Sequence, residues 1–498
     1  MKPKKLNRRD FLKSAALVTV GGILASCGTK TNTPESVNPP PPNEPTAPVL
    51  PSEPTVESRP TDTPESIVPP APNEPTAPPP PVGSSSDTVV YWVAWPEDTY
   101  GKAMSPMQEL DEFKALLGGK KFEMKYGVPE EALLTSLAAG APPDGGSNFN
   151  YMDYMTRGVV FPLDDLIASS SIIKKEDFIQ AIWDVGVYQG KDYGLPANEC
   201  FVQLGFCYNA RLVKEAGLDP DVPPETWDDL YEWHKAITKI DASGNVKVIG
   251  YDPTDFMGQT IWGSSAWDVS TSWGFEWYDE NAAKFNLNNE FVVDYFKTAK
   301  KFVDLIGIDK LTAFSSVQGQ GGWGPAFYAE VLACMEDGYW EPGEMNAIKP
   351  ELSANNRTTW MPVPASRKGT KAQGAGGHIV MIFKDGKNHE EMYKISEWLT
   401  TKTAADLIFR SIGWLPARKS YLDAVDPKTY NGLEFFLKSA TEATYWGTTV
   451  KCPITTFIGT IYPQVREQVF RNELTPQQAA ADLQKRAEDE LANQGFNK

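Results

Sequence analysis

The chain has 498 residues, a formal net charge of −18 and 41% hydrophobic residues. This hydrophobic fraction is ordinary for a globular protein. The acidic surplus argues against binding to nucleic acid, which requires basic patches, and against an electrostatic grip on anionic lipid.

The N-terminus has the features of an export signal. Basic residues precede a small and apolar run, 15–25, that is too short to span a bilayer comfortably. Arg8 and Arg9 lie in a segment that resembles a twin-arginine export signal, although Asn7 stands where that pattern usually has Ser or Thr.

The apolar run ends at Cys27. Leu24-Ala25-Ser26-Cys27 resembles a bacterial lipobox, which implies cleavage before Cys27 and a diacylglycerol on its thiol. The alternative is an ordinary signal peptide with a chance cysteine. With a lipid anchor, the protein would sit on the outer face of the cytoplasmic membrane.

Residues 28–87 are predicted to be a disordered linker. Pro, Glu, Thr, Ala and Ser dominate, and Pro-Asn-Glu-Pro-Thr-Ala-Pro occurs at 42–48 and again at 72–78. Such a composition cannot bury enough apolar surface to fold, and Pro-rich chains stay extended. A spacer that holds a folded domain away from the membrane is favoured over a recognition motif.

From Thr88 onward, strand patterns alternate with helix patterns, which predicts an α/β fold. The predicted strands are 88–95, 200–208 and 377–383. The predicted helices are 107–117, 130–139, 227–237, 291–305, 390–412 and one that begins at 476. Gly118-Gly119 is expected to end the first helix, while Thr226 and Thr475 are expected to cap two others.

The cysteines and histidines predict no metal or redox site. Cys200 and Cys207 would point to opposite faces of a strand, and no Cys-x-x-Cys occurs. The three histidines are scattered. Structural roles are expected for these residues, with no cofactor and no metal.

Five short segments resemble those of the extracellular solute-binding proteins of ABC transporters. They are LAAGAPPD at 137–144, GVVFPLDD at 158–165, YGLP at 193–196 with Tyr208-Asn209, AGLD at 216–219 before TWDDL at 226–230, and GWLP at 413–416. In this order they are similar to the carbohydrate-binding branch, family 1, whose members are maltose-binding-protein-like. The resemblance covers essentially all of residues 88–498.

The resemblance implies a two-lobed α/β fold of the type II periplasmic-binding-protein class, with the ligand in a cleft between the lobes. Lobe 1 would comprise 88–198 and 376–413, and lobe 2 would comprise 201–372 and 416–498. Crossovers would fall near Asn198-Glu199, near 374–376 and near Leu415-Pro416. The closed form would dock on membrane permease subunits, and the protein is expected to be a monomer.

The positions of the family's contacts, with the Trp-rich composition, suggest a ligand-binding wall. The candidates are Trp95, Asn148, Tyr151, Asp153, Asn198, Glu199, Trp262, Trp267, Trp340, Gly377, His378 and Trp414. Aromatic rings pack on the C–H faces of sugars, and polar groups pair with sugar hydroxyls. A sugar or oligosaccharide is therefore the expected ligand.

Other functions remain open at this point. A polyamine would favour several carboxylates in the cleft, and a peptide or an organic acid would be a further option. A secreted polysaccharide hydrolase would need two carboxylates across a cleft, which the sequence does not exclude. A sensor without a transporter has the same sequence features, but a binding protein that is not an enzyme is preferred.

Overall fold

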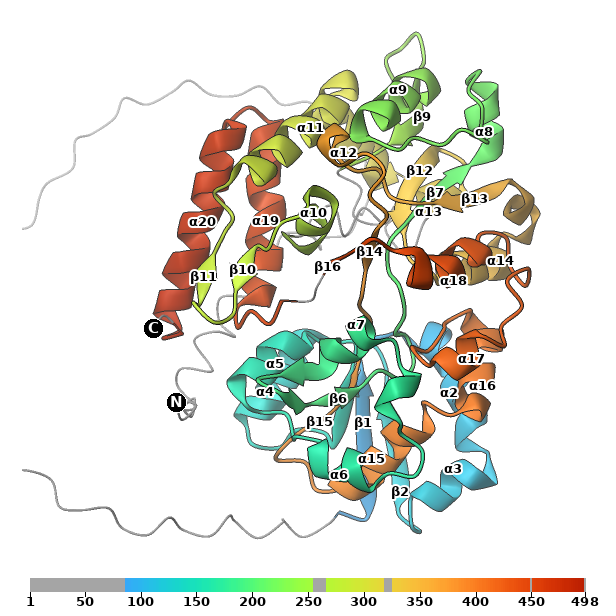
Figure 1. Ribbon diagram of the computed structural model, residues 1–498, viewed down its shortest axis with the longest axis vertical. Coiled ribbons are helices and arrows are strands. Elements are labelled where there is room, and N and C mark those ends of the chain that lie inside the picture. The colour runs from blue at the N-terminus through green and yellow to red at the C-terminus, as the bar shows by residue number, and fades with distance from the viewer. Residues whose placement is uncertain (1–85, 254–265, 318–324, 448–449, 497–498) are drawn as a thin grey trace, which may run out of the picture. The chain divides into compact units, whose positions relative to one another are not determined.

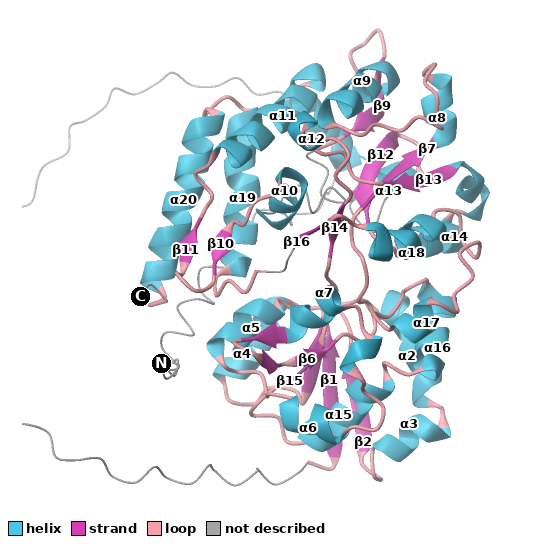
Figure 2. Cartoon of the chain, in the orientation of Figure 1, coloured by secondary structure: helices cyan, strands magenta, loops and turns pink. Residues whose placement is uncertain are grey.

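The computed structural model describes residues 86–253, 266–317, 325–447 and 450–496 (Figure 1). Arg8 and Arg9 of the predicted export signal, the predicted lipidation residue Cys27 and residues 28–85 of the predicted linker lie outside these ranges. Within them, every helix is too short or too polar to cross a membrane. Two five-stranded sheets organise the described chain, and helices flank both (Figure 2).

The first sheet is built on a parallel core. Its order is β2 (Lys121–Lys125), β1 (Thr88–Val93), β3 (Gly145–Ser147), β15 (Val380–Ile382) and β6 (Gly194–Leu195). β1 pairs in parallel with β2 and β3, whereas β15 pairs antiparallel with β3 and β6. Val89, Tyr91 and Val93 are fully buried and alternate with partly exposed residues, so one face of β1 supplies core.

Helices of the first lobe surround this sheet. They are α2 (Glu97–Gln108), α3 (Asp111–Leu116), α4 (Glu130–Ala138), α5 (Tyr151–Arg157), α6 (Asp164–Ser169), α7 (Gln180–Trp183), α15 (His389–Trp398), α16 (Lys402–Ile412) and α17 (Lys419–Leu422). A small hairpin, β4 (Val187–Tyr188) with β5 (Lys191–Asp192), lies before β6.

The second sheet has the order β13 (Asn356–Thr359), β7 (Gly205–Asn209), β12 (Leu332–Asp337), β9 (Val246–Tyr251) and β8 (Lys239–Ile240). Every residue of β7 and β12 is buried. Such strands carry no alternation, because both of their faces are covered.

Helices of the second lobe are α8 (Ala210–Glu215), α9 (Trp227–Ile237), α10 (Ala266–Trp273), α11 (Glu290–Ile306), α12 (Ile308–Val317), α13 (Pro325–Tyr328), α14 (Glu341–Ile348), α18 (Leu433–Glu442), α19 (Thr455–Phe470) and α20 (Pro476–Asn493). Two short ladders accompany them: β10 (Tyr278–Asp279) with β11 (Lys284–Phe285), and β14 (Ala372–Gly374) with β16 (Tyr445–Gly447).

Short sequence signals predicted several helix ends correctly. Thr226 and Thr475 both form complete capping boxes, at the starts of α9 and α20. Gly118 and Gly119 adopt positive φ directly after α3, as expected of residues that end a helix. The predicted α/β character is confirmed.

Two predicted helices are wrong because each is two helices. The predicted 107–117 segment is divided at Leu110, which is extended, so that α2 ends at Gln108 and α3 begins at Asp111. The predicted 390–412 segment is divided at Thr401, whose side chain accepts a hydrogen bond from Ala404 N and caps α16. Only Thr401 provides a side-chain cap for the new helix, whereas Leu110 separates its two helices by its extended backbone alone.

The predicted strands are longer than the observed ones. β1 ends at Val93, β7 begins only at Gly205, and β15 spans only three residues, Val380–Ile382. Residues 200–204 and 377–379 lie between the two sheets instead, so their apolar character reflects burial at a crossover.

The predicted boundary at Pro416 also moves. Residues 417–420 still pack on the first lobe, because Ile179 N donates to Ala417 O at 3.1 Å and Arg418 Nε binds Asp177 at 2.7 Å. The chain reaches the second lobe with α18, which packs on β13.

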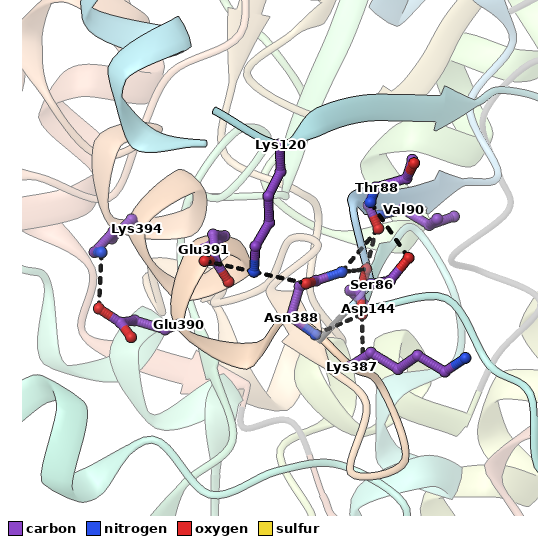
Figure 3. A network of polar contacts seen from close by, with 10 residues as sticks. All are labelled: Ser86, Thr88, Val90, Lys120, Asp144, Lys387, Asn388, Glu390, Glu391 and Lys394. Carbon is purple, nitrogen blue, oxygen red and sulfur yellow. Dashed lines mark hydrogen bonds and ion pairs between the residues drawn. The ribbon is translucent and has the colours of Figure 1, made fainter. Parts of the chain in front are cut away.

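Asp144 ties three segments of the first lobe together (Figure 3). Its Oδ1 accepts hydrogen bonds from the backbone N–H groups of Lys387 and Asn388, at 2.7 and 2.8 Å. Its Oδ2 accepts from Val90 N at 2.8 Å and from Asn388 Nδ2 at 3.0 Å. Asp144 is 4% exposed, so these four donors depend on it. The Pro-Asp step of the sequence therefore anchors β1 to the start of α15.

We predict that Asp144→Ala lowers the free energy of unfolding by about 3–5 kcal/mol, because four donors in a buried setting lose their acceptor. Urea denaturation of the purified chain measures this. Asp165→Ala is the matched control, since Asp165 is exposed in the first turn of α6 and its loss should change stability by less than about 0.5 kcal/mol. Equal effects of the two variants would contradict the anchoring role.

Candidate functional site

Three crossovers between the lobes meet at residues 198–203. The first crossover joins β6 to β7, the second joins β14 to β15, and the third follows α16. Gln203 N donates to Gly374 O at 3.0 Å, and His378 N donates to Glu199 O at 2.8 Å, so the first two crossovers run against each other. Cys200 N donates to Leu415 O at 3.4 Å, which adds the third.

Gly377 permits this close approach. Its φ of +125° lies in a region that side chains avoid, and a Cβ there would lie 2.4 Å from Cys200 Cα and 2.5 Å from Glu199 O. At the third crossover, Gly413 packs on Gly343 of α14, where an added Cβ on Gly343 would lie 2.7 Å from Gly413 Cα. Backbone therefore meets backbone between the lobes at two places.

Three predicted aromatic residues come together beside the crossovers. The Trp95 ring lies 4.9 Å from that of Trp414 and 5.3 Å from that of His378, in an edge-on arrangement with the latter. Tyr100 completes the group, 4.9 Å from Trp95 and stacked on Trp414 at 5.8 Å. We call Trp95, Tyr100, His378 and Trp414 the aromatic cluster. The sequence missed Tyr100, because it lies inside α2 and looks like an ordinary core residue.

Exposure differs sharply within the aromatic cluster. Trp95 and Trp414 are each 4% exposed, and Tyr100 is fully buried. The His378 side chain keeps 29% of its surface exposed. Protein nevertheless surrounds this ring so closely that desolvation lowers the pKa of His378 to about 4. His378 is thus a neutral ring at neutral pH, and it is the member of the cluster that solvent reaches most.

Glu199 lies next to the aromatic cluster and is almost buried. Its side chain is 6% exposed, and its Oε2 lies 3.5 Å from His378 Nε2. Burial raises the pKa of Glu199 to about 8, and the Glu344 carboxyl of α14 acts in the same direction. Burial and Glu341 also raise the pKa of Glu344 to about 8. At neutral pH these groups are mainly uncharged and can donate as well as accept hydrogen bonds.

Asn198 and Trp340 border the same junction. Asn198 adopts a φ of +69°, is 1% exposed and donates from Nδ2 to Tyr91 Oη at 3.4 Å. Trp340 precedes α14, is 5% exposed and packs edge-on against Tyr339 at 5.4 Å. Tyr339 in turn lies 5.4 Å from Phe201 of the first crossover. Neither Tyr339 nor Glu344 was a candidate, because strand ends and helix faces in lobe 2 could not be related to the crossovers from sequence.

A second group of candidates lies at α5. Both carboxylate oxygens of Asp153 are occupied: Oδ1 accepts from Thr455 N at 3.0 Å and Oδ2 from Thr456 Oγ1 at 2.8 Å, at the start of α19. Asn150 Nδ2 donates to Thr456 Oγ1 at 2.7 Å. Asp153 thus joins a first-lobe helix to a second-lobe helix. Its role toward a ligand stays a prediction.

The remaining candidates are less fully described. Asn148 is half-buried with a φ of +60°, and Tyr151 is 9% exposed at the first position of α5. Trp262 lies outside the described residues. Trp267 belongs to α10, but its side chain lies outside the description.

Comparisons with known proteins bear on the whole described chain. Residues 105–406 match the family described as bacterial extracellular solute-binding proteins. A Sinorhizobium fredii protein, described as a probable amino-acid ABC transporter periplasmic-binding protein, is 25% identical over 400 residues, which span 75% of this chain and 83% of that protein.

Solved structures share the two-lobed fold. The protein CpMnBP1, solved with mannotriose bound, superposes with a TM-score of 0.68 at 22% identity and covers 80% of this chain and 99% of its own. The sugar-binding protein MalE of Xanthomonas citri gives 0.63 at 20% identity, covering 82% and 98%. An ABC substrate-binding protein of Listeria monocytogenes, in complex with cycloalternan, gives 0.64 at 20% identity, covering 81% and 99%.

The contact between the first two crossovers predicts a strong effect of Gly377→Ala. Strain at positive φ and the clash with Cys200 together should lower the free energy of unfolding by about 3–4 kcal/mol. Gly307→Ala is the matched control, because Gly307 also has a positive φ, +96°, but nothing within 4 Å of an added Cβ. Gly307→Ala should lower the free energy of unfolding by about 1–2 kcal/mol, from backbone strain alone. Thermal denaturation of both variants measures the difference, and similar losses would show that the crossovers are not tightly packed.

Proposed function

The chain belongs to the bacterial extracellular solute-binding proteins, and from this premise we propose that it captures a sugar or oligosaccharide between its lobes and delivers it to an ABC importer. One observation carries the proposal: the aromatic cluster, including the partly exposed ring of His378, lies beside the carboxyl of Glu199 where the crossovers meet. Sugars need both an apolar face and uncharged partners for their hydroxyls.

The ligands of proteins with the same fold support this choice. Mannotriose and cycloalternan are bound by two of them, and a third is named a sugar-binding protein. One relative is named for amino acids, so an amino acid is the second candidate ligand. The ammonium group of such a ligand would suit ionised carboxylates, which Glu199 and Glu344 could provide. The raised pKa values of these two groups favour the neutral sugar at pH 7.

Capture would work by closure of the two lobes about the crossovers. A ligand that contacts both lobes favours the closed state by its differential affinity for that state. Glu199 and His378 belong to different crossovers yet lie side by side, so a ligand held there would bind at the junction about which the lobes would close. The closed form would then dock on permease subunits in the membrane, as a monomer and without chemical change to the sugar.

The N-terminal features complete the proposal. Arg8 and Arg9 would direct export, Cys27 would carry the lipid, and residues 28–87 would act as a spacer between membrane and binding domain. The protein would thus work at the outer face of the cytoplasmic membrane.

A thermal-shift screen of the purified chain tests the ligand class. Mannotriose, maltotriose and cycloalternan are added in parallel with amino acids, polyamines and organic acids. A ligand at a hundred times its Kd adds about 2.7 kcal/mol of stability, which raises Tm visibly. We expect a rise with one saccharide and no consumption of it. A rise in Tm only with another class of compound would exclude a sugar as the ligand, and turnover of the saccharide would indicate a hydrolase.

With the saccharide in hand, we expect His378→Ala to weaken binding by at least about tenfold, equivalent to about 1.4 kcal/mol. Isothermal titration calorimetry measures this Kd. His389→Ala is the matched control, because His389 packs on Phe161 at 4.4 Å in the first lobe and its loss should leave Kd unchanged. If the two variants bind the saccharide with the same Kd, His378 does not contribute to binding as proposed.

The anchor is tested by cell fractionation. We expect the wild-type chain to sediment with membranes and Cys27→Ala to remain in the soluble fraction, because one cysteine carries the whole lipid. Cys27→Ala that still sediments would contradict the lipid anchor.

A further inference from the structure

Glu199 and Cys200 together connect the first crossover to the other two. Its backbone oxygen accepts the His378 N–H at 2.8 Å, and the next residue, Cys200, donates to Leu415 O of the third crossover. Gly377 lies so close that a Cβ there would come within 2.5 Å of Glu199 O. The backbone that carries this carboxyl is therefore held against the other two crossovers.

The groups that face this carboxyl come from every element packed on it. His378 faces it from the second crossover, Tyr339 from the loop after β12, and Glu344 from α14, while Gln203 and the Cys200 thiol belong to its own segment. The ion-pair partner that the described residues offer is His378, at 3.5 Å. That ring is neutral, since the pKa of His378 is lowered to about 4. Lys102 acts on Glu344 instead.

An ionised carboxylate in this setting would thus lack a countercharge and would face a second acidic group. Burial raises the pKa of Glu199 to about 8; the neighbouring Glu344 carboxyl acts in the same direction, and the Tyr339 and Gln203 side chains oppose it. A buried carboxyl without a cation remains protonated instead of bearing the full desolvation cost. Its proton also lacks a strong acceptor in His378, because 3.5 Å is too long for a good hydrogen bond.

Two further polar atoms beside Glu199 have open hydrogen-bonding capacity. Asn198 Oδ1 and His378 Nδ1 are buried and find no hydrogen-bond partner within the described ranges. Buried polar atoms in folded proteins are nearly always paired with protein or with water, so these two atoms can take hydroxyl groups of a ligand as partners. The three side chains together offer donors and acceptors but no charge.

We propose that Glu199 binds the ligand as an uncharged carboxylic acid, donating its proton to an oxygen atom of a neutral polyol at the meeting point of the three crossovers. This inference rests on the proposed sugar-binding function and deepens it. It assigns Glu199 a role in specificity: a neutral polyol is accepted, whereas a protonated amine would find no carboxylate at neutral pH. It also makes capture sensitive to the loss of a single proton.

The sign of the pH effect follows directly. Below pH 8 Glu199 carries the proton that the ligand oxygen accepts, and binding is at its full strength. Above pH 8 the carboxyl ionises, the donor disappears and a negative charge faces the ligand oxygen. Affinity should therefore fall about tenfold for each pH unit above 8.

Calorimetric titration of the full chain from pH 6 to 9.5 tests this, with the tightest binder among mannotriose, maltotriose and cycloalternan as the probe. We expect the wild-type Kd to be flat to about pH 7.5 and then to weaken by about 30-fold by pH 9.5. Glu199→Gln, whose amide always donates, should bind with a Kd that stays flat across the range. Glu344→Gln is the matched control. Its affinity should still fall as pH rises, but the fall should begin at a lower pH, because removal of the neighbouring acid lowers the pKa of Glu199.

The outcomes separate this inference from the function on which it rests. A wild-type Kd that is flat to pH 9.5, or a folded Glu199→Gln protein that no longer binds at pH 7, overturns the uncharged donor while sugar binding stands. If no saccharide binds the wild type at pH 7, the sugar-binding function and the inference fail together. Should Glu199→Gln not fold, as judged by circular dichroism, the wild-type pH profile decides alone.

Discussion

The contact of backbone on backbone between the crossovers is the constraint on which the rest of the structure depends. Gly377 lies against Cys200 and Glu199, and Gly413 lies against Gly343, with no room for a side chain at either contact. This packing brings residues distant in sequence, such as Glu199 and His378, into one small volume. The proposed closure of the lobes would therefore turn about this junction, because closely packed backbone cannot slide without breaking its hydrogen bonds.

The electrostatics of the junction follow from that packing. Crowding removes water from Glu199, Glu344 and His378, and each responds by favouring its neutral form. Although the chain has a formal charge of −18, these three groups are therefore mainly uncharged at neutral pH where the crossovers meet. The pKa values of the two carboxyls are higher in the folded state than in the unfolded state. Their protonation therefore stabilises the fold at low pH, and this contribution to the free energy of unfolding declines as pH rises from about 4.5 to 8.

Much of the local structure could be predicted because its causes are local. A capping box such as that of Thr226 fixes a helix start whatever the surroundings. The family resemblance brought Trp95, His378 and Trp414 into one candidate set, and the structure groups their rings. The breaks at Leu110 and Thr401 were missed, because a stripe of apolar residues continues across each. Tyr100 and Glu344 could not be found, since only tertiary packing brings them to the junction.

The most direct test of the central claim, that ligand held at the junction drives lobe closure, is single-molecule energy transfer between dyes on the two lobes. Glu123→Cys in β2 and Val222→Cys in the second lobe provide exposed attachment points, in a Cys27→Ala background whose other described cysteines are buried. We expect a saturating saccharide, shown by calorimetry to bind, to shift the distribution of transfer efficiencies to a single new value. An unchanged distribution in the presence of bound saccharide would contradict it.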